Sequence, residues 1–191
     1  MFAETYDKSK CDIIETDENV IDKLREQGIY KENKTGVVCF NIEGSSFMFP
    51  LKNGKTEGIQ KSYIAGFLFT EIPYKNGKAE GIGKTYYESG ALMEETPFKN
   101  DIKEGIGKSY KEDGRLFSTV TYQNDKVISG KCANGRKWTN AEINNWEKGL
   151  DVVCGRKKSY ALYYLIQGFL LYKVIVKYYI FYRYFGLLHS L

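Results

Sequence analysis

The chain is short of the residue types on which most catalytic sites depend. It has one histidine, His189, so a Ser-His-Asp or Cys-His arrangement would have no base away from the chain end. The chain has four cysteines, which are Cys11, Cys39, Cys132 and Cys154, and no two of them have Cys-x-x-Cys spacing. With so few nitrogen and sulfur ligands, a zinc site is not expected. We therefore expect a protein that is not an enzyme and that has neither a metal nor another cofactor.

Acidic residues are missing from the C-terminal part of the chain. All 24 Asp and Glu lie at or before Asp151, and 22 of the 28 Lys and Arg lie in the first 155 residues. Those 22 cations and 24 acids give the first part a formal net charge of −2, and the remaining 6 cations give residues 156–191 a charge of +6. The first part is close to neutral, which argues against nucleic acid as its partner.

A secretory signal is also missing from the first residues, which include Glu4 and Asp7 and contain no apolar run. The sequence as encoded therefore predicts a cytoplasmic protein. If the true start lies upstream, the alternative is an exported protein.

What the chain does contain is an internal repeat. Residues 51–58 recur at residues 74–81 and 98–105, and in a shorter form at residues 122–125, at intervals of 23, 24 and 24 residues. A fixed period of this size is typical of a stacked array of one small unit. Such arrays are stabilised by contacts between neighbouring units and present an extended surface. The repeat therefore favours a binding protein over a catalytic one.

Each unit is predicted to form a β-hairpin. Ile82 and Tyr86 are four residues apart, and Leu92 and Phe98 are six apart, so each pair is predicted to share one face of a strand. Turn residues such as Gly90 separate the two strands, and Lys-Asn-Gly segments lead into the next unit. The predicted fold is mainly β: an antiparallel meander of repeated hairpins, with short terminal helices and an apolar C-terminal tail.

The repeat also resembles a known family. Residues 81–86 and 105–110 both read Gly-x-Gly-Lys-x-Tyr, and a glycine, a leucine, an aromatic residue and Lys-Asn follow at matching positions. This pattern resembles the MORN-type repeat, and more closely the bacterial variant found in YwqK-type antitoxins. The first unit departs from it at Gln60, which replaces the second glycine. The resemblance implies a non-enzymatic scaffold for protein binding, with an antitoxin that neutralises a partner toxin as the alternative.

The repeats, residues 36–130, are flanked by a segment on each side. Residues 1–35 are charged, and Val20, Ile21 and Leu24 have helical spacing ahead of Gly28, which predicts a short helix over the start of the array. This helix is expected to end at Gly28.

The segment after the repeats, residues 131–155, is predicted to form a C-terminal cap. Thr139 and Glu142 have capping-box spacing and begin a predicted helix. Ile143 and Trp146 on that helix are expected to pack near Leu116 and Tyr122 of the last hairpin.

One candidate binding face follows from the repeat. Tyrosines and lysines recur at equivalent positions in successive units, namely Tyr63, Tyr86, Tyr110, Lys61, Lys84 and Lys108. They are expected to line up across the array, where they could contact a protein partner or anionic lipid headgroups. The alternative is that rows of Lys, and of Glu57, Glu80 and Glu104, only keep a thin sheet soluble. The Gly-Lys-Thr and Gly-Lys-Ser triplets lack the upstream glycine of a P-loop, so they are interpreted as strand residues.

The cysteines have two interpretations. In an oxidising compartment Cys132 and Cys154, which flank the predicted C-terminal helix, form the favoured disulfide. In a reducing cytoplasm all four cysteines would instead be small buried apolar residues.

The tail, residues 156–191, opens with Arg156, Lys157 and Lys158 and contains 8 of the 16 tyrosines. Its longest run without charge, residues 159–172, is too short to span a bilayer. Three interpretations stay open: a segment that attaches to an anionic lipid surface, a frameshifted tail without selected structure, and a segment that packs in the core.

Overall fold

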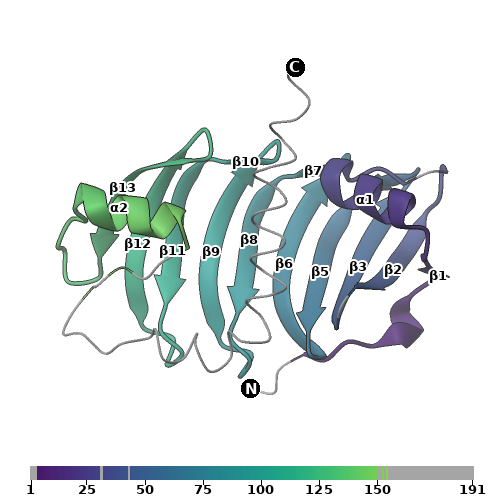
Figure 1. Ribbon diagram of the computed structural model, residues 1–191, viewed down its shortest axis with the longest axis horizontal. Coiled ribbons are helices and arrows are strands. Elements are labelled where there is room, and N and C mark those ends of the chain that lie inside the picture. Colours follow the sequence, from purple (N-terminus) through teal and green to yellow (C-terminus); the bar gives the residue numbers. More distant parts are fainter. Residues whose placement is uncertain (1–3, 31, 43, 150–151, 153, 155–191) are drawn as a thin grey trace.

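Thirteen strands form one sheet in the computed structural model, which describes residues 4–30, 32–42, 44–149, 152 and 154 (Figure 1). The main path runs β1-β2-β3-β5-β6-β8-β9-β11-β12-β13, and β4, β7 and β10 pair with β3, β6 and β9. Only β1 and β2 are parallel; the other printed strand pairs are antiparallel. The predicted fold, an antiparallel meander with two short helices, is confirmed. The calls on residues 156–191 lie outside the described residues.

The elements have the following bounds. After a 3-10 helix (Lys8–Lys10), the chain forms β1 (Ile13–Ile14), α1 (Glu18–Gln27), β2 (Gly36–Ile42), β3 (Ser45–Lys52), β4 (Lys55–Thr56), β5 (Gly58–Ile64), β6 (Phe67–Lys75), β7 (Lys78–Ala79), β8 (Gly81–Tyr86), β9 (Leu92–Lys99), β10 (Ile102–Lys103), β11 (Gly105–Tyr110), β12 (Leu116–Gln123), β13 (Lys126–Cys132) and α2 (Asn140–Glu147).

Two-residue turns end each repeat and connect it to the next. Asn53 and Gly54, for example, join β3 to β4 with φ angles of 51° and 72°. Such turns need a positive φ at both residues, which Asn and Gly adopt most easily. The repeated Lys-Asn-Gly segment is therefore the sequence signal for this tight hairpin.

A β-bulge near the tip of the repeat hairpins changes one sequence-based prediction. Thr85 pairs with Glu94, but the next pair is Tyr86 with Leu92, so β9 has one extra residue at this point. Leu92 therefore shares a face with Tyr86, whereas Phe98 lies on the other face opposite Gly81. The prediction that Leu92 and Phe98 share a face was wrong because it assumed an unbroken alternation of side chains.

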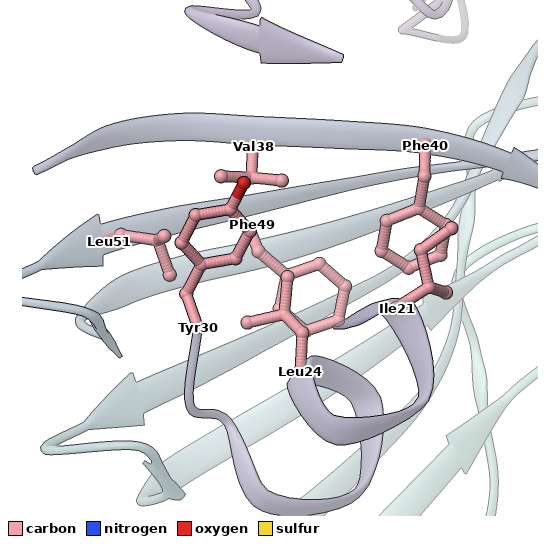
Figure 2. Close-up of a cluster of buried hydrophobic side chains, with 7 residues drawn as sticks. All are labelled: Ile21, Leu24, Tyr30, Val38, Phe40, Phe49 and Leu51. Atoms are coloured by element: carbon pink, nitrogen blue, oxygen red, sulfur yellow. The ribbon is translucent and has the colours of Figure 1, made fainter. Parts of the chain in front are cut away.

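The helix α1 covers one face of β2 and β3, and we call this side of the sheet the helix face. Asp17 caps the helix, and Gly28 ends it with a left-handed φ of 62°, as the spacing predicted. Figure 2 shows the side chains of Leu24 and Ile21 directed at strand residues that include Phe40 and Phe49. Leu24 and Phe40 are fully buried. This cluster closes the N-terminal end of the sheet.

The helix α2 lies at the opposite end of the sheet, beside β12 and β13 (Figure 1). Thr139 and Glu142 form the predicted capping box. Trp146 packs against the last hairpin, and its Nε1 donates a hydrogen bond of 3.0 Å to the hydroxyl of Tyr122. Leu116 is 39% exposed and does not join this cluster, contrary to prediction, because an equivalent bulge in the next hairpin, between Ser109 and Tyr110, places it on the other face.

The glycines of the Gly-x-Gly motif make room for aromatic rings on the helix face. A Cβ atom on Gly83 would lie 2.8 Å from the ring of Phe98, and one on Gly107 would lie 3.0 Å from the ring of Tyr122. Both glycines lie within strands. The Gly-Lys-Thr and Gly-Lys-Ser triplets therefore belong to a packing motif, and no P-loop is formed at them.

Two disulfides connect the flanking segments to the sheet. Cys132 at the end of β13 is joined to Cys154, the pair favoured for an oxidising compartment. Cys11 is joined to Cys39 of β2, a pair that the spacing did not single out. No free cysteine remains.

Candidate binding face

A row of alternating charges crosses the sheet on the side opposite the helices, which we call the ladder face. The strand register places the side chains in the order Lys61, Glu71, Lys84, Glu95, Lys108, Thr119, Lys131, each opposite the next. Lys61 and Glu71 lie 3.1 Å apart, and Lys108 and Glu95 lie 3.3 Å apart. Adjacent strands are about 4.8 Å apart, so each carboxylate lies within reach of a lysine on either side. We call this row the charge ladder.

The ladder tyrosines donate to carboxylates of the preceding hairpin. The hydroxyl of Tyr86 donates to Glu71 at 2.7 Å, and that of Tyr110 donates to Glu95 at 2.8 Å. Burial and the bond to Glu71 raise the pKa of Tyr86. The hydrogen bond from Tyr110, aided by Lys108, lowers the pKa of Glu95. These tyrosines therefore tie neighbouring repeats together, and the hydrogen bond from Tyr110 favours the charged form of Glu95.

The first tyrosine of the row is covered by the chain itself. Tyr63 is 1% exposed, and its hydroxyl donates to Glu4 at 3.0 Å. The ring of Tyr6 lies 5.4 Å from the ring of Tyr63 in an edge-on arrangement. Tyr63 cannot contact a partner while it is buried in this way, so its predicted place on the binding face is wrong. Tyr86 and Tyr110 are half-buried, and Lys84 and Lys108 are exposed.

A row of exposed isoleucines runs beside the charge ladder. Ile59, Ile82 and Ile106 are 51%, 47% and 62% exposed and lie two residues before the ladder lysines. Pro73, which is half-buried, is opposite Ile59, and Pro97, which is buried, is opposite Ile82, so the exposed isoleucines lie on alternate strands of a row that crosses five strands, or about 19 Å. We call it the isoleucine row. The sequence pattern placed Ile82 in a strand, and none of the three isoleucines was predicted to be a binding residue.

The repeated glutamates, which lie just before the first strand of each hairpin and which we call the edge glutamates, have a structural role. Carboxylates of Glu57, Glu80 and Glu104 each accept a hydrogen bond from a backbone N–H in the turn of the next repeat, at 2.7–2.9 Å. The acceptors therefore connect one repeat to the next. They form a row, as predicted, and the row lies next to the isoleucines on the side away from the lysines.

The described residues offer no constellation for a metal. No group of three or more His, Cys, Asp or Glu side chains within them is placed to hold an ion. No helix in the described part of the chain has the length and apolarity of a membrane span. The predicted lipid contacts Arg156, Lys157 and Lys158 lie outside the described residues.

Comparison with known families agrees with this architecture. Residues 79–100 and 103–124 match the MORN repeat variant. Two adjacent units of this sheet are therefore MORN-variant repeats. They comprise the hairpins in which Glu80, Glu104 and the Gly-x-Gly pairs recur. The match concerns architecture, and the resemblance to YwqK-type antitoxins receives no separate support.

One solved structure to which part of this chain is similar is the crystal structure of accessory secretory protein 1, 2 and 3 in Streptococcus pneumoniae. The similarity has a TM-score of 0.38 at 9% identity and covers 71% of this chain. It covers 30% of that chain, so the present chain spans about a third of its length. At this level the likeness says nothing about what the MORN-variant repeats bind. No curated protein matches the sequence at a significant level.

Proposed function

We propose that this protein is a non-enzymatic scaffold whose ladder face binds a protein partner. The isoleucine row is the observation that carries this proposal. Exposed apolar side chains are common when scattered, but three large ones aligned across successive repeats, with polar margins, are typical of an interaction site. Here the margins are the lysines of the charge ladder and the edge glutamates. An apolar centre with a polar rim is the usual anatomy of a protein interface.

The tyrosines have a supporting role in this proposal. Their hydroxyls are engaged by Glu71 and Glu95, so they shape the face and fix the spacing between repeats. The exposed parts available to a partner are the isoleucines and the lysines Lys84 and Lys108. In this proposal the scaffold binds its partner through isoleucine and lysine side chains, and not through a surface lined by tyrosines.

Replacing Ile82 and Ile106 together with serine tests the proposal. We expect the immobilised full-length variant to capture at least about ten-fold less partner from an extract of the source cells, because truncating central apolar residues removes most of the binding energy. Quantitative mass spectrometry of the captured proteins measures the effect. Both side chains are solvent-exposed, so the melting temperature should change little.

Ile14 and Ile102 offer a matched control, because they are 42% and 38% exposed and lie outside the row. Serine at both control positions removes the same chemical groups. Capture by the control variant should equal capture by the unmodified protein. Equal losses in the two variants, or no loss in either, would contradict a binding site on the isoleucine row.

The antitoxin alternative is a special case of this scaffold. A toxin would be the partner, and neutralisation would occur by direct binding at the same face. Co-expression with a small toxic reading frame next to the gene distinguishes it from other partners. Growth rescued by the unmodified protein and lost in the Ile82→Ser, Ile106→Ser variant would support the antitoxin function.

Two disulfides support an oxidising compartment as the place of function. Disulfides persist in secreted and periplasmic proteins and are rare in a reducing cytoplasm. We infer the exported alternative on this basis, in place of the cytoplasmic location expected from the first residues.

We also propose that residues 156–191 attach the protein to an anionic lipid surface, and removing them tests this. The shortened chain changes from +4 to −2 in formal charge, which opposes binding to anionic lipid because each nearby cation contributes roughly 1 kcal/mol. We expect liposome flotation to be lost and the circular dichroism spectrum of the sheet to be kept. A shortened chain that unfolds would show that the tail is part of the core, and one that still floats would place lipid binding on the repeats.

A further inference from the structure

The charge ladder is interrupted once at each end of the sheet. In the strand before Lys61 the equivalent position is Met48, and in the strand before Lys131 it is Thr119. At both places a lysine has no carboxylate opposite it in the preceding strand, the position that Glu71 and Glu95 occupy for Lys84 and Lys108. At one interruption another segment of the chain supplies a carboxylate, and at the other interruption no described residue does so. This difference indicates a binding site at the second interruption.

At the Met48 end, a distant segment of the chain supplies the missing carboxylate. Glu4 lies 2.8 Å from Nζ of Lys61 and also accepts the hydroxyl of Tyr63. Burial opposes ionisation of this carboxyl, but the hydrogen bonds from Lys61 and Tyr63 outweigh it and lower the pKa of Glu4. The segment is extended: the backbone N–H of Leu68 donates to the carbonyl of Glu4. The ladder face therefore binds an acidic residue of an extended segment at this end.

The side chains around Glu4 are covered as a result. Leu68, at the hairpin tip beside Tyr63, is only 8% exposed. The Lys61 side chain is 26% exposed. At the other end the equivalent residues are open, with 39% exposure for Leu116 and 49% for the Lys108 side chain.

At the Thr119 end, no carboxylate of the described residues takes the vacant place. Lys108 lies on one side of Thr119 and Lys131 on the other, with their Cα atoms about 10 Å apart across two strand spacings. Lys131 is exposed and makes no ion pair with any residue that the structure describes. Ile106 and Leu116 provide exposed apolar surface on either side along the strands.

We propose that Thr119, Lys108 and Lys131 form the docking site for an extended acidic segment of the protein partner, with one of its carboxylates over Thr119 between the two lysines. This inference rests on the proposed scaffold function and names the chemistry of its partner. Charge complementarity supports the inference, because two cations, Lys108 and Lys131, flank the neutral hydroxyl of Thr119 in a row whose charges otherwise alternate in sign. The Glu4 segment of this chain shows the same mode of binding at the opposite end.

A labelled peptide provides the probe. We choose the synthetic heptapeptide Ser-Thr-Glu-Leu-Glu-Thr-Ser, whose two glutamates lie on one face of an extended chain, and its Gln-Leu-Gln counterpart. Fluorescence anisotropy with the full-length protein measures both dissociation constants. The Gln peptide should bind at least about ten-fold more weakly, because it cannot form the charge-assisted hydrogen bonds that a carboxylate makes with the two lysines.

Thr119→Glu is the decisive variant, because it fills the vacant place from within the chain. It should weaken binding of the Glu peptide by about ten-fold or more, while a melting temperature at least equal to that of the unmodified protein shows that the fold is kept. Thr121→Glu is the matched control: it adds the same charge to the same face of β12, but opposite Ile106 and Ser129. Its effect should stay within about three-fold, the range of a surface charge at a distance.

Three outcomes would overturn the inference: no binding of the Glu peptide, equal binding of the Gln peptide, or equal losses from Thr119→Glu and Thr121→Glu. Partner capture by the isoleucine row is measured separately. If the peptide fails but capture still depends on Ile82 and Ile106, the acidic docking site is wrong and the scaffold proposal stands. If the peptide binds as expected but capture does not depend on the row, the acidic site stands and the isoleucine row is wrong.

Discussion

Replacing Trp138 with alanine should lower the free energy of unfolding by about 3–5 kcal/mol, the usual loss for a buried tryptophan. Trp138 is 7% exposed and belongs to the cluster that contains Val120, Tyr122 and Val127. Its ring lies against β13 and 5.2 Å from the ring of Trp146. The change would empty the centre of this cluster. Urea unfolding followed by circular dichroism measures the loss.

Trp146→Ala is the comparison variant. Trp146 is only half-buried, so its loss should be smaller than the 3–5 kcal/mol expected from full burial. If Trp146→Ala proved more harmful than Trp138→Ala, the buried cluster would not be centred on Trp138.

Gly130 lies against the ring of Trp138. A Cβ atom at Gly130 would lie 2.0 Å from two atoms of the Trp138 ring, so Gly130→Ala must displace that ring. Overpacking of this kind costs roughly 1–3 kcal/mol. In the Trp138→Ala background the same substitution should be nearly neutral, because the ring is gone. The two effects should therefore be non-additive in a double-mutant cycle, and additive effects would show that the ring does not lie on Gly130.

The elements that were predicted correctly depend on local signals. Asp17 and Gly28 bound α1, and Thr139 with Glu142 begins α2, because a cap is formed by residues within a few positions of each other. The hairpins follow from turn residues that adopt a positive φ. Repetition at a fixed interval then implies that the same strands pair in every unit.

The features that were missed depend on distant contacts or on local irregularity. Glu4 meets Lys61 across 57 positions of sequence, and nothing in either neighbourhood indicates this pairing. The bulge beside Leu92 reverses the side chains that follow, and alternation alone cannot show it. The exposure of the isoleucine row was also missed, because a recurring isoleucine in a strand is more often a core residue. Its position two residues from each ladder lysine, opposite in face to the Gly-x-Gly pair, was the available signal.

The Cys132–Cys154 disulfide should contribute about 3 kcal/mol to stability, since the chain-entropy relation gives that value for a closed loop of roughly 20 residues. The disulfide holds Val152, which is 5% exposed, in the cluster with Trp138. Replacing Cys132 and Cys154 together with alanine should lower the free energy of urea unfolding by that amount. Fluorescence of the Trp138 cluster should report the loss.

Reductant provides the control on the same protein. Dithiothreitol should destabilise the unmodified chain by more than it destabilises the double variant, because the variant has only the Cys11–Cys39 disulfide left to reduce. The Cys11→Ala, Cys39→Ala variant should show the converse, with its C-terminal cluster still sensitive to reductant. If reductant changes none of the unfolding curves, neither disulfide stabilises the protein, and a reducing cytoplasm would suit it as well as an oxidising compartment. Loss of the C-terminal cluster on reduction would instead tie the folded cap to oxidising conditions.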